Sequence, residues 1–309
     1  MVRENRSRFG GGVALVSSAL PYDDVVLTIG NDVAIEANYA EANGGGIYCS
    51  GEGASVAVKG GPLRIAANVS SHSGGGVALD SGCHIALASA GAPSGAVVEA
   101  NVAADGAGVS ADGADTLAQL YTTDPDAPLV VSGNHAWGRG GAFHIAHGAR
   151  IDAYDVVLAD NRAERGGGAV YVIDGLVPVD RQAVRFRMTR DVSDAPAGAV
   201  RCAAPKRCNL LIGNVAQAAD GTAQRGAALL IHGDGAGNVI LAPSASFYGA
   251  TFEGHYGRTL IETVAPTHGY AGARVRLFAS LIHRNTAREA LIENPPRLDV
   301  NRCRVAQSR

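Results

Sequence analysis

The stretch LVVSGNHAWGRGGAFHI, residues 129–145, carries the features that predict the fold. Val131 is followed three residues later by Asn134, and a cluster of small residues begins at Gly140. Apolar residues occupy alternate positions before the Asn and again at Phe143 and Ile145. Alternation of period two indicates half-buried strands, whereas Asn and Gly favour turns. The stretch therefore predicts short strands separated by tight turns.

The same pattern recurs along the whole chain, with 23 to 41 residues between successive copies. Asn followed two residues later by Ala or Ser marks most copies, and we call this Asn the anchor. The anchors are Asn5, Asn38, Asn68, Asn101, Asn134, Asn161, Asn214 and Asn285, with degenerate copies at Asp191 and His255 and an end of the series at Ser308. Stacked amides can bond from one copy to the next. We therefore expect a turn ladder of Asn38, Asn68, Asn101, Asn134, Asn161, Asn214 and Asn285.

One unit cannot bury its apolar face, but a stack of units can. A propeller blade of about 40–45 residues fits these intervals badly, and the Leu framework of leucine-rich repeats is missing. The sequence therefore predicts an all-β chain, a right-handed parallel β-helix of about ten coils that forms one solenoid domain over residues 1–309. The residues three before the anchors should form one buried ladder, which includes Ile35, Ile65, Val98, Val131, Leu158 and, in the copy at Asp191, Met188.

The motifs Gly167-Gly-Ala-Val170 and Gly140-Gly-Ala-Phe143, with apolar-x-x-Asn steps such as Ile35 to Asn38, resemble bacterial surface β-helix proteins. The polymorphic outer membrane proteins carry such motifs, and predicted secreted repeat proteins with a CSLREA-type leader are more similar still. The resemblance implies a pectate-lyase-like solenoid and an extracellular or cell-surface location. It transfers no catalytic residue. Because relatives carry secretion signals, we expect the chain to be a fragment that lacks its signal peptide and one or both caps.

Charge is distributed unevenly along the chain. Residues 1–138 have a net charge of −9 and residues 139–309 a net charge of +6, and Arg outnumbers Lys 24 to 2. No apolar run is long enough for a transmembrane helix, and the absence of interleaved basic and aromatic residues argues against nucleic acid as a partner. The densest basic segment predicts a weak docking patch for anionic polysaccharide or lipopolysaccharide, comprising Arg181, Arg185, Arg187 and Arg190. We expect Asp155 and Val157 to lie beside Arg185 and Arg187 in the neighbouring coil.

A search for chemistry finds no catalytic residue, no metal site and no cofactor motif. The pair Asp23-Asp24 and the lone His268 lack the partners that polysaccharide hydrolases and lyases use. The densest polar group comprises His144 and His147, with Asp152 and Asp155 nearby. Because zinc needs three or four converging ligands, we interpret the two histidines as surface side chains.

The five cysteines form no CxxC motif. Cys202 and Cys208 flank five residues and are a possible disulfide, whereas Cys49, Cys83 and Cys303 are interpreted as lone thiols.

An apolar stripe is expected on the outside of three consecutive coils, at Val97, Val130 and Val157. Solvated strands usually place polar side chains at such positions. Either a partner or a segment of the same chain should therefore cover the stripe, and the connection Asp112–Pro128 is the favoured cover.

These observations predict a non-catalytic rod with a structural or adhesive role, whose partner is a cell-surface polysaccharide or another cell-surface ligand. Two alternatives stay open: a carbohydrate-active enzyme, either a polysaccharide lyase or a glycoside hydrolase, and a carbohydrate-binding module on the same scaffold. The oligomeric state is not predicted.

Overall fold

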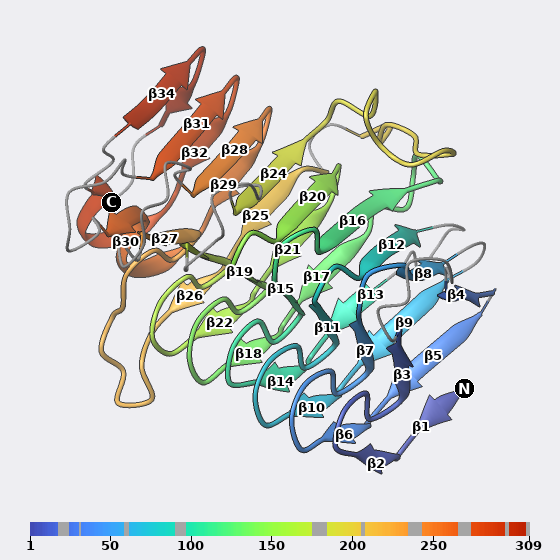
Figure 1. Ribbon diagram of the computed structural model, residues 1–309. Helices are drawn as coiled ribbons and strands as arrows, with labels where there is room; N and C mark the ends of the chain where they lie inside the picture. Colours follow the sequence, from blue (N-terminus) through green and yellow to red (C-terminus); the bar gives the residue numbers. More distant parts are fainter. Residues whose placement is uncertain are drawn as a thin grey trace.

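A computed structural model describes residues 1–17, 25–30, 32–58, 62–89, 97–174, 184–204, 208–233, 243–264, 273–293 and 297–306. Within these ranges the chain forms strands, turns and loops, with no helix. Figure 1 shows that corresponding strands of successive coils lie side by side, with the two termini at opposite ends of the stack. All strand pairs within the three sheets are parallel, so the chain forms the expected parallel β-helix.

Sheet A contains the strands that precede the anchors. Its ten strands follow one another through the stack in sequence order. They are β1 (Val2–Arg3), β5 (Val33–Glu36), β9 (Leu63–Ala66), β13 (Val97–Glu99), β17 (Val130–Ser132), β21 (Val157–Ala159), β25 (Leu210–Ile212), β29 (Thr251–Glu253), β32 (Leu281–His283) and β35 (Arg304–Val305).

Sheet B has two arms that join at one long strand. The short arm, directly after the anchors, contains β2 (Arg6–Ser7), β6 (Tyr39–Ala40), β10 (Val69–Ser70), β14 (Val102–Ala103), β18 (His135–Ala136), β22 (Arg162–Ala163) and β26 (Val215–Ala216). The long arm contains β3 (Val13–Val16), β7 (Ile47–Ser50), β11 (Val77–Asp80), β15 (Val109–Asp112), β19 (Phe143–Ala146), β23 (Val170–Asp174) and β27 (Leu229–Gly233). Both arms pair with β30 (Tyr256–Val264), which in turn pairs with β33 (Thr286–Glu293).

Sheet C completes each coil before the chain returns to sheet A. Its nine strands are β4 (Val25–Ile29), β8 (Ala54–Val58), β12 (His84–Ser89), β16 (Leu117–Thr122), β20 (Arg150–Tyr154), β24 (Arg185–Thr189), β28 (Ser244–Tyr248), β31 (Arg274–Phe278) and β34 (Arg297–Asn301).

The buried ladder of sheet A lies at the expected phase. Ile35, Ile65, Val98, Val131 and Leu158 pair in successive coils, and each is at most 1% exposed. The ladder then continues with Leu211, Phe252 and Ile282. A row of rings crosses the interior beside it, since Phe186 contacts both Phe143 and Phe247 and Phe247 contacts Phe252. Removal of these side chains from water provides the main driving force for stacking.

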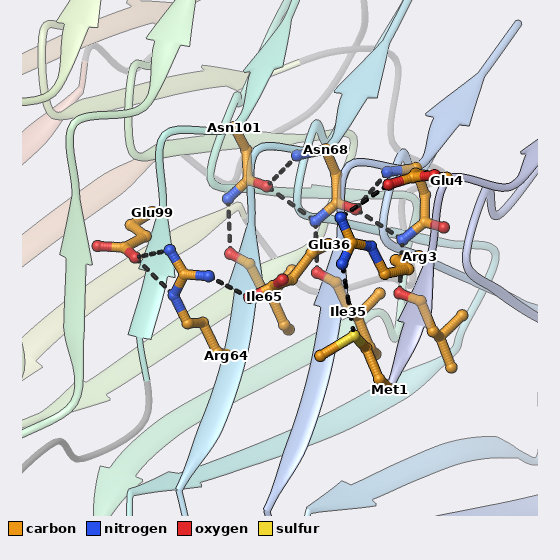
Figure 2. A network of polar contacts seen from close by, with 12 residues as sticks. Met1, Arg3, Glu4, Ile35, Glu36, Arg64, Ile65, Asn68, Glu99 and Asn101 are labelled. Carbon is orange, nitrogen blue, oxygen red and sulfur yellow. Dashed lines mark hydrogen bonds and ion pairs between the residues drawn. The ribbon is translucent and has the colours of Figure 1, made fainter.

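The anchor amides form a hydrogen-bonded ladder inside the turn after sheet A. Asn68 Nδ2 donates to Asn101 Oδ1 at 3.1 Å and to Ile35 O at 2.9 Å (Figure 2). Asn68 Oδ1 accepts hydrogen bonds from Nδ2 and from the backbone N–H of Asn38. The same contacts repeat from Asn5 to Asn214. Each buried amide in the middle of the ladder is thus satisfied at both ends, which is the condition under which a buried polar group does not destabilise.

The first residue of each small-residue cluster is always glycine because its backbone is left-handed. Gly44, Gly74 and Gly140 have φ values of +72°, +67° and +68°, a conformation that side chains with a Cβ rarely adopt. Alanine replaces glycine at later places in the cluster, for example Ala107 and Ala142. The left-handed glycine therefore defines the bend between the two arms of sheet B.

The copy at Asp191 is not an anchor, which corrects one sequence expectation. Leu158 pairs directly with Leu211, and Asn161 Nδ2 donates to Asn214 Oδ1. Met188 belongs to β24 of sheet C instead of sheet A. Residues 190–204 form an inserted loop, so the chain takes one long coil where the spacing suggested two. Ser308 lies outside the described residues.

Two further expectations about particular residues were wrong. Cys49 and Cys83 are joined by a disulfide between neighbouring coils, with a Cα–Cα distance of 5.9 Å, so they are not lone thiols. The connection Asp112–Pro128 is not a single covering loop, because its residues Leu117–Thr122 form strand β16 of sheet C. Val97, Val130 and Val157 do lie in one register row of sheet A, and Leu210 extends it.

Candidate anion-binding face

Arginine side chains gather on the outer face of sheet C because of simple strand alternation. On β24, Phe186 and Met188 point into the core, so Arg185 and Arg187 point outward. Strands β20 and β28 flank β24, and β31 lies next to β28 (Figure 1); all three follow the same alternation. Their register forms two outward rows, Arg150, Arg185, Ser244 and Arg274 in the first and Asp152, Arg187, Ser246 and Arg276 in the second. We call the surface formed by Arg150, Arg185, Arg187, Arg274 and Arg276 the arginine face.

Asp152 is shared by two arginines of this face. Its side chain is fully buried, and it contacts Arg150 closely and Arg185 at 3.8 Å. Neither Asp152 oxygen accepts a hydrogen bond from a described residue, and the Nε of Arg185 is likewise buried without a partner. Burial and the neighbouring charge of Arg150 lower the pKa of Arg185 despite Asp152. Positive charge is therefore crowded at this point of the face.

The remaining arginines of the face have exposed partners. Arg187 Nη1 donates to Asp194 at 3.0 Å. Burial alone lowers the pKa of Arg187, but this bond together with the charges of nearby acidic groups raises it overall. Arg274 and Arg276 share Asp299, at 3.8 and 3.5 Å, beyond the usual hydrogen-bond range. Five cations of the face thus have three carboxylates as described partners. An additional anion would find a favourable potential here.

Aromatic side chains continue the same strands. Tyr248 of β28 and Phe278 of β31 are paired in register, with ring centroids 6.2 Å apart. Phe278 is 36% exposed, and the guanidinium of Arg302 lies 5.9 Å from the centre of its ring. An aromatic platform thus lies directly next to the charged rows.

The inserted loop, residues 190–204, packs against the side chains of Ala88, Tyr121 and Tyr154, which belong to β12, β16 and β20. Asp155 is buried and fastens the loop, accepting hydrogen bonds from the backbone N–H of Cys202 and from Nε of Arg190. Burial raises the pKa of Asp155, although these two donors oppose the change. Cys202 forms a disulfide with Cys208, and Tyr154 donates to the carbonyl oxygen of Asp194. The loop is therefore held both covalently and by a buried charge.

The predicted docking residues take different places in the structure. Arg185 and Arg187 share the outward face of β24, whereas Arg190 turns toward buried Asp155 and Arg181 lies outside the described residues. The expected neighbours were wrong, because Arg150 and Asp152, not Asp155 and Val157, pair with Arg185 and Arg187. The difference arises because the repeat spacing predicts a sheet A strand before Asp191, whereas that strand, β24, belongs to sheet C.

Three arginines of the face escaped the sequence search, namely Arg150, Arg274 and Arg276. Their signal is the alternating pair Arg-x-Arg or Arg-x-Asp within an apolar strand pattern, present at residues 150–152, 185–187 and 274–276. Alignment of the strands by this Arg-x-Arg or Arg-x-Asp pair, instead of by their distance from an anchor, identifies these three arginines from the sequence.

The other polar group singled out in the sequence is divided between sheets. His144 lies on β19 and stacks on Tyr171 with ring centroids 5.4 Å apart, while Asp152 lies on β20 of sheet C. His147 Nδ1 lies 2.5 Å from Asp112 Oδ1. Burial alone raises the pKa of Asp112, but this contact together with His144 and the backbone N–H of Gly113 lowers it overall. Across the described ranges, no group of three or more His, Cys, Asp or Glu side chains is arranged to hold a metal ion. Asp23, Asp24 and His268 fall outside those ranges.

Comparison with known proteins adds no relative. No protein-family model, no curated protein and no solved structure matches the chain. None of the described segments is a helix long and apolar enough to cross a membrane.

Proposed function

We propose that this chain is a non-catalytic β-helix rod of an extracellular or bacterial cell-surface protein, which docks an anionic polysaccharide on its arginine face. The observation that carries the proposal is the excess of cations on one flat outer sheet, where five arginines have three described carboxylate partners. A rigid sheet presents these charges on β20, β24 and β31, where neighbouring strands are about 4.8 Å apart and the uncharged β28 separates β24 from β31, and such an array suits a polyanion. The solenoid supplies length and rigidity for such a surface.

The disulfides support the proposed location. Cys49–Cys83 and Cys202–Cys208 both link cysteines within this chain. Structural disulfides persist mainly in secreted, periplasmic and surface proteins, because the cytosol keeps thiols reduced. Two such bonds in one chain favour an oxidising compartment.

Binding to immobilised anionic polysaccharide tests the proposal. The triple variant Arg185→Gln, Arg274→Gln and Arg276→Gln should weaken binding about tenfold or more, since a hydrogen bond to a charged group contributes about 1.5–3 kcal/mol. Binding by the unaltered chain should also fall steeply with ionic strength, as screening shortens the reach of exposed charges to about 10 Å at 0.1 M salt.

A matched control removes the same charge elsewhere. Arg3, Arg6 and Arg284 have side chains that are 54%, 71% and 78% exposed and lie outside the arginine face. The variant with all three changed to Gln should bind like the unaltered chain. Equal loss in both triple variants would show that net charge alone matters and would contradict a specific docking face.

One observation favours the enzyme alternative. Glu262 of β30 and Glu293 of β33 are paired in register, and burial raises the pKa of Glu262 even though Thr259 donates to it and Arg225 lies 3.2 Å away. Glycoside hydrolases use a pair of carboxyl groups, one of which has a raised pKa. Glu262 is only 1% exposed, however, so a substrate reaches it only if neighbouring side chains such as Arg225 move away.

Incubation with polygalacturonate and with neutral polysaccharides, with and without calcium, separates the two functions. A rod leaves all polymers intact. Release of oligosaccharides that is lost in Glu293→Gln but kept in Glu289→Gln, an exposed glutamate of the same strand, would favour the enzyme.

A further inference from the structure

The three most exposed arginines of the arginine face surround two serines. Arg185, Arg274 and Arg276 have side chains that are about two-fifths exposed, 40%, 39% and 42%. Strand β28 runs between them, with Ser244 in register between Arg185 and Arg274. Ser246 occupies the corresponding place between Arg187 and Arg276. The short hydroxyl side chains of β28 therefore separate the arginines of β24 from the arginines of β31. Two strand spacings place these two strands about 9.6 Å apart.

The groups around the serines have hydrogen-bonding capacity to spare. Within the described part of the chain, the guanidinium groups of Arg185, Arg274 and Arg276 donate no hydrogen bond, and their carboxylate contacts are 3.5 to 3.8 Å long. The pair Ser244 and Ser246 adds two hydroxyl groups on the outward side of β28, where Ser244 is half-buried and Ser246 is 8% exposed. Guanidinium and hydroxyl donors that converge from adjacent strands match an oxyanion, which accepts several hydrogen bonds at once.

The aromatic platform lies at the right place for a sugar ring. Tyr248 follows Ser246 by two residues on β28, so the two side chains point to the same side about 6.6 Å apart along the strand. Phe278 stands beside Tyr248 on β31 and is 36% exposed. Aromatic faces provide apolar contact area, while the polar groups beside them fix the orientation of a ligand.

We propose that Ser244, Ser246, Arg185, Arg274, Arg276 and Phe278 form a subsite for one acidic sugar residue, whose carboxylate or sulfate group contacts the serines and arginines while its ring lies against Phe278. This inference rests on the proposed docking function and specifies its ligand: a saccharide that carries an oxyanion, not a polyanion in general. The subsite predicts a requirement for the ring as well as for the charge.

Titration of the purified chain with three ligands tests the subsite. The ligands are an oligogalacturonate, which carries carboxylates, a heparin-derived oligosaccharide, which also carries sulfates, and inorganic polyphosphate, which has no sugar ring. Ser246→Val replaces a hydroxyl donor with a branched apolar side chain. We expect it to cause at least a fivefold loss of affinity for one or both saccharides. Phe278→Ala should cause a similar loss for the saccharides with less than a twofold change for polyphosphate.

Control variants guard against a general effect on folding. Ser55→Val changes a serine on β8 of the same sheet, away from the arginine face, and Trp137→Ala removes another exposed ring, 46% exposed. Both should leave all affinities within twofold. Phe278→Tyr keeps the ring and should retain saccharide binding, and an unchanged melting temperature for each variant confirms that the fold is intact.

The outcomes separate this inference from the proposed function. If Ser246→Val and Phe278→Ala bind both saccharides normally while the double variant Arg274→Gln and Arg276→Gln does not, the face binds by charge alone and the subsite is overturned. If the arginine variant also binds normally, the docking function fails as well. Preferential loss for the carboxylated or the sulfated saccharide identifies the acidic group, and a chain that binds neither saccharide overturns the subsite.

Discussion

The first coils and the last coils differ in how the chain runs from one arm of sheet B to the other. In coils one to seven a left-handed glycine, such as Gly140, bends the chain and divides sheet B into two arms. The last described coils have no glycine at that place, and β30 and β33 continue as strands of nine and eight residues with a bulge near Gly257. The anchor changes too, because His255 replaces Asn. The cross-section of the rod therefore depends on a few turn residues rather than on the apolar pattern, which both regions share.

The ladder amides should show the largest difference between the two regions. The side chain of Asn134 makes four hydrogen bonds, to Val98 and Asn161 as donor and from two donors of Asn101 as acceptor. Asn134→Ala leaves buried donors without partners and should lower the free energy of unfolding by about 4 kcal/mol. Asn285 forms two such bonds, so Asn285→Ala should cost about 2 kcal/mol. Denaturant titration measures both, and equal costs would contradict a ladder whose strength depends on neighbours on both sides.

The glycine bend provides the second test. A Cβ at Gly140 would lie within overlap distance of the Phe143 backbone, and its φ is +68°. Gly140→Val should therefore lower the free energy of unfolding by about 3 kcal/mol, from left-handed strain of about 1–2 kcal/mol and forced displacement of packed atoms. In the last coils, which lack the glycine bend, the exposed Arg288 on β33 has no such constraint. Arg288→Val should therefore change the free energy of unfolding by no more than about 0.5 kcal/mol. Thermal unfolding of the two variants compares the regions directly.

His255 makes the end of the ladder sensitive to pH. Its two ring nitrogens lie 3.3 and 3.0 Å from the carbonyl oxygens of Asn214 and Leu211, and burial lowers its pKa from 6.5 to about 4. A lowered folded-state pKa means that the unfolded chain binds the proton more readily. Stability from this group is therefore complete above pH 6.5 and is lost as the pH falls toward 4, by about 3 kcal/mol.

Replacement by the residue of the other coils isolates this effect. His255→Asn restores an amide able to donate to Leu211, and the loss of stability between pH 6.5 and 4 should shrink by about 3 kcal/mol relative to the unaltered chain. Other carboxylates titrate in the same window, so the difference between the two chains is the quantity to measure. Parallel stability curves for both chains would show that His255 does not titrate as proposed.

The parts of the fold that were predictable are those with strong local demands on the backbone. Asn134 and Gly140 belong to a turn and a bend that few other residues can form, so their spacing indicated the solenoid, the buried ladder and the amide ladder. Sheet C has no such marker. Loops of different length precede it, and Phe186 and Met188 therefore resembled a sheet A strand.

The arginine face was only half predictable for the same reason. Arg185 and Arg187 share a strand, so alternation placed them on one face, but Arg274 and Arg276 reach that face through the register of strands nearly 90 residues away in sequence. Cys49 and Cys83 illustrate the same limit, because a pairing between coils depends on the register and not on spacing alone.

The smallest expected effect concerns the inserted loop, which interrupts the otherwise regular middle coils. In chain-entropy terms, a disulfide across six residues such as Cys202–Cys208 contributes about 2 kcal/mol, and the bond across 34 residues between Cys49 and Cys83 contributes about 4 kcal/mol. The double variant Cys202→Ala and Cys208→Ala should therefore lose about 2 kcal/mol. Its amide exchange should rise mainly at Val200 and Ala203, whose N–H groups bond to Thr122 and Pro125. The ladder amides of Asn134 and Asn161 should stay protected, because their bonds do not involve the loop. Exchange that rises equally in the loop and the ladder would mean that the loop and the coils unfold as one unit.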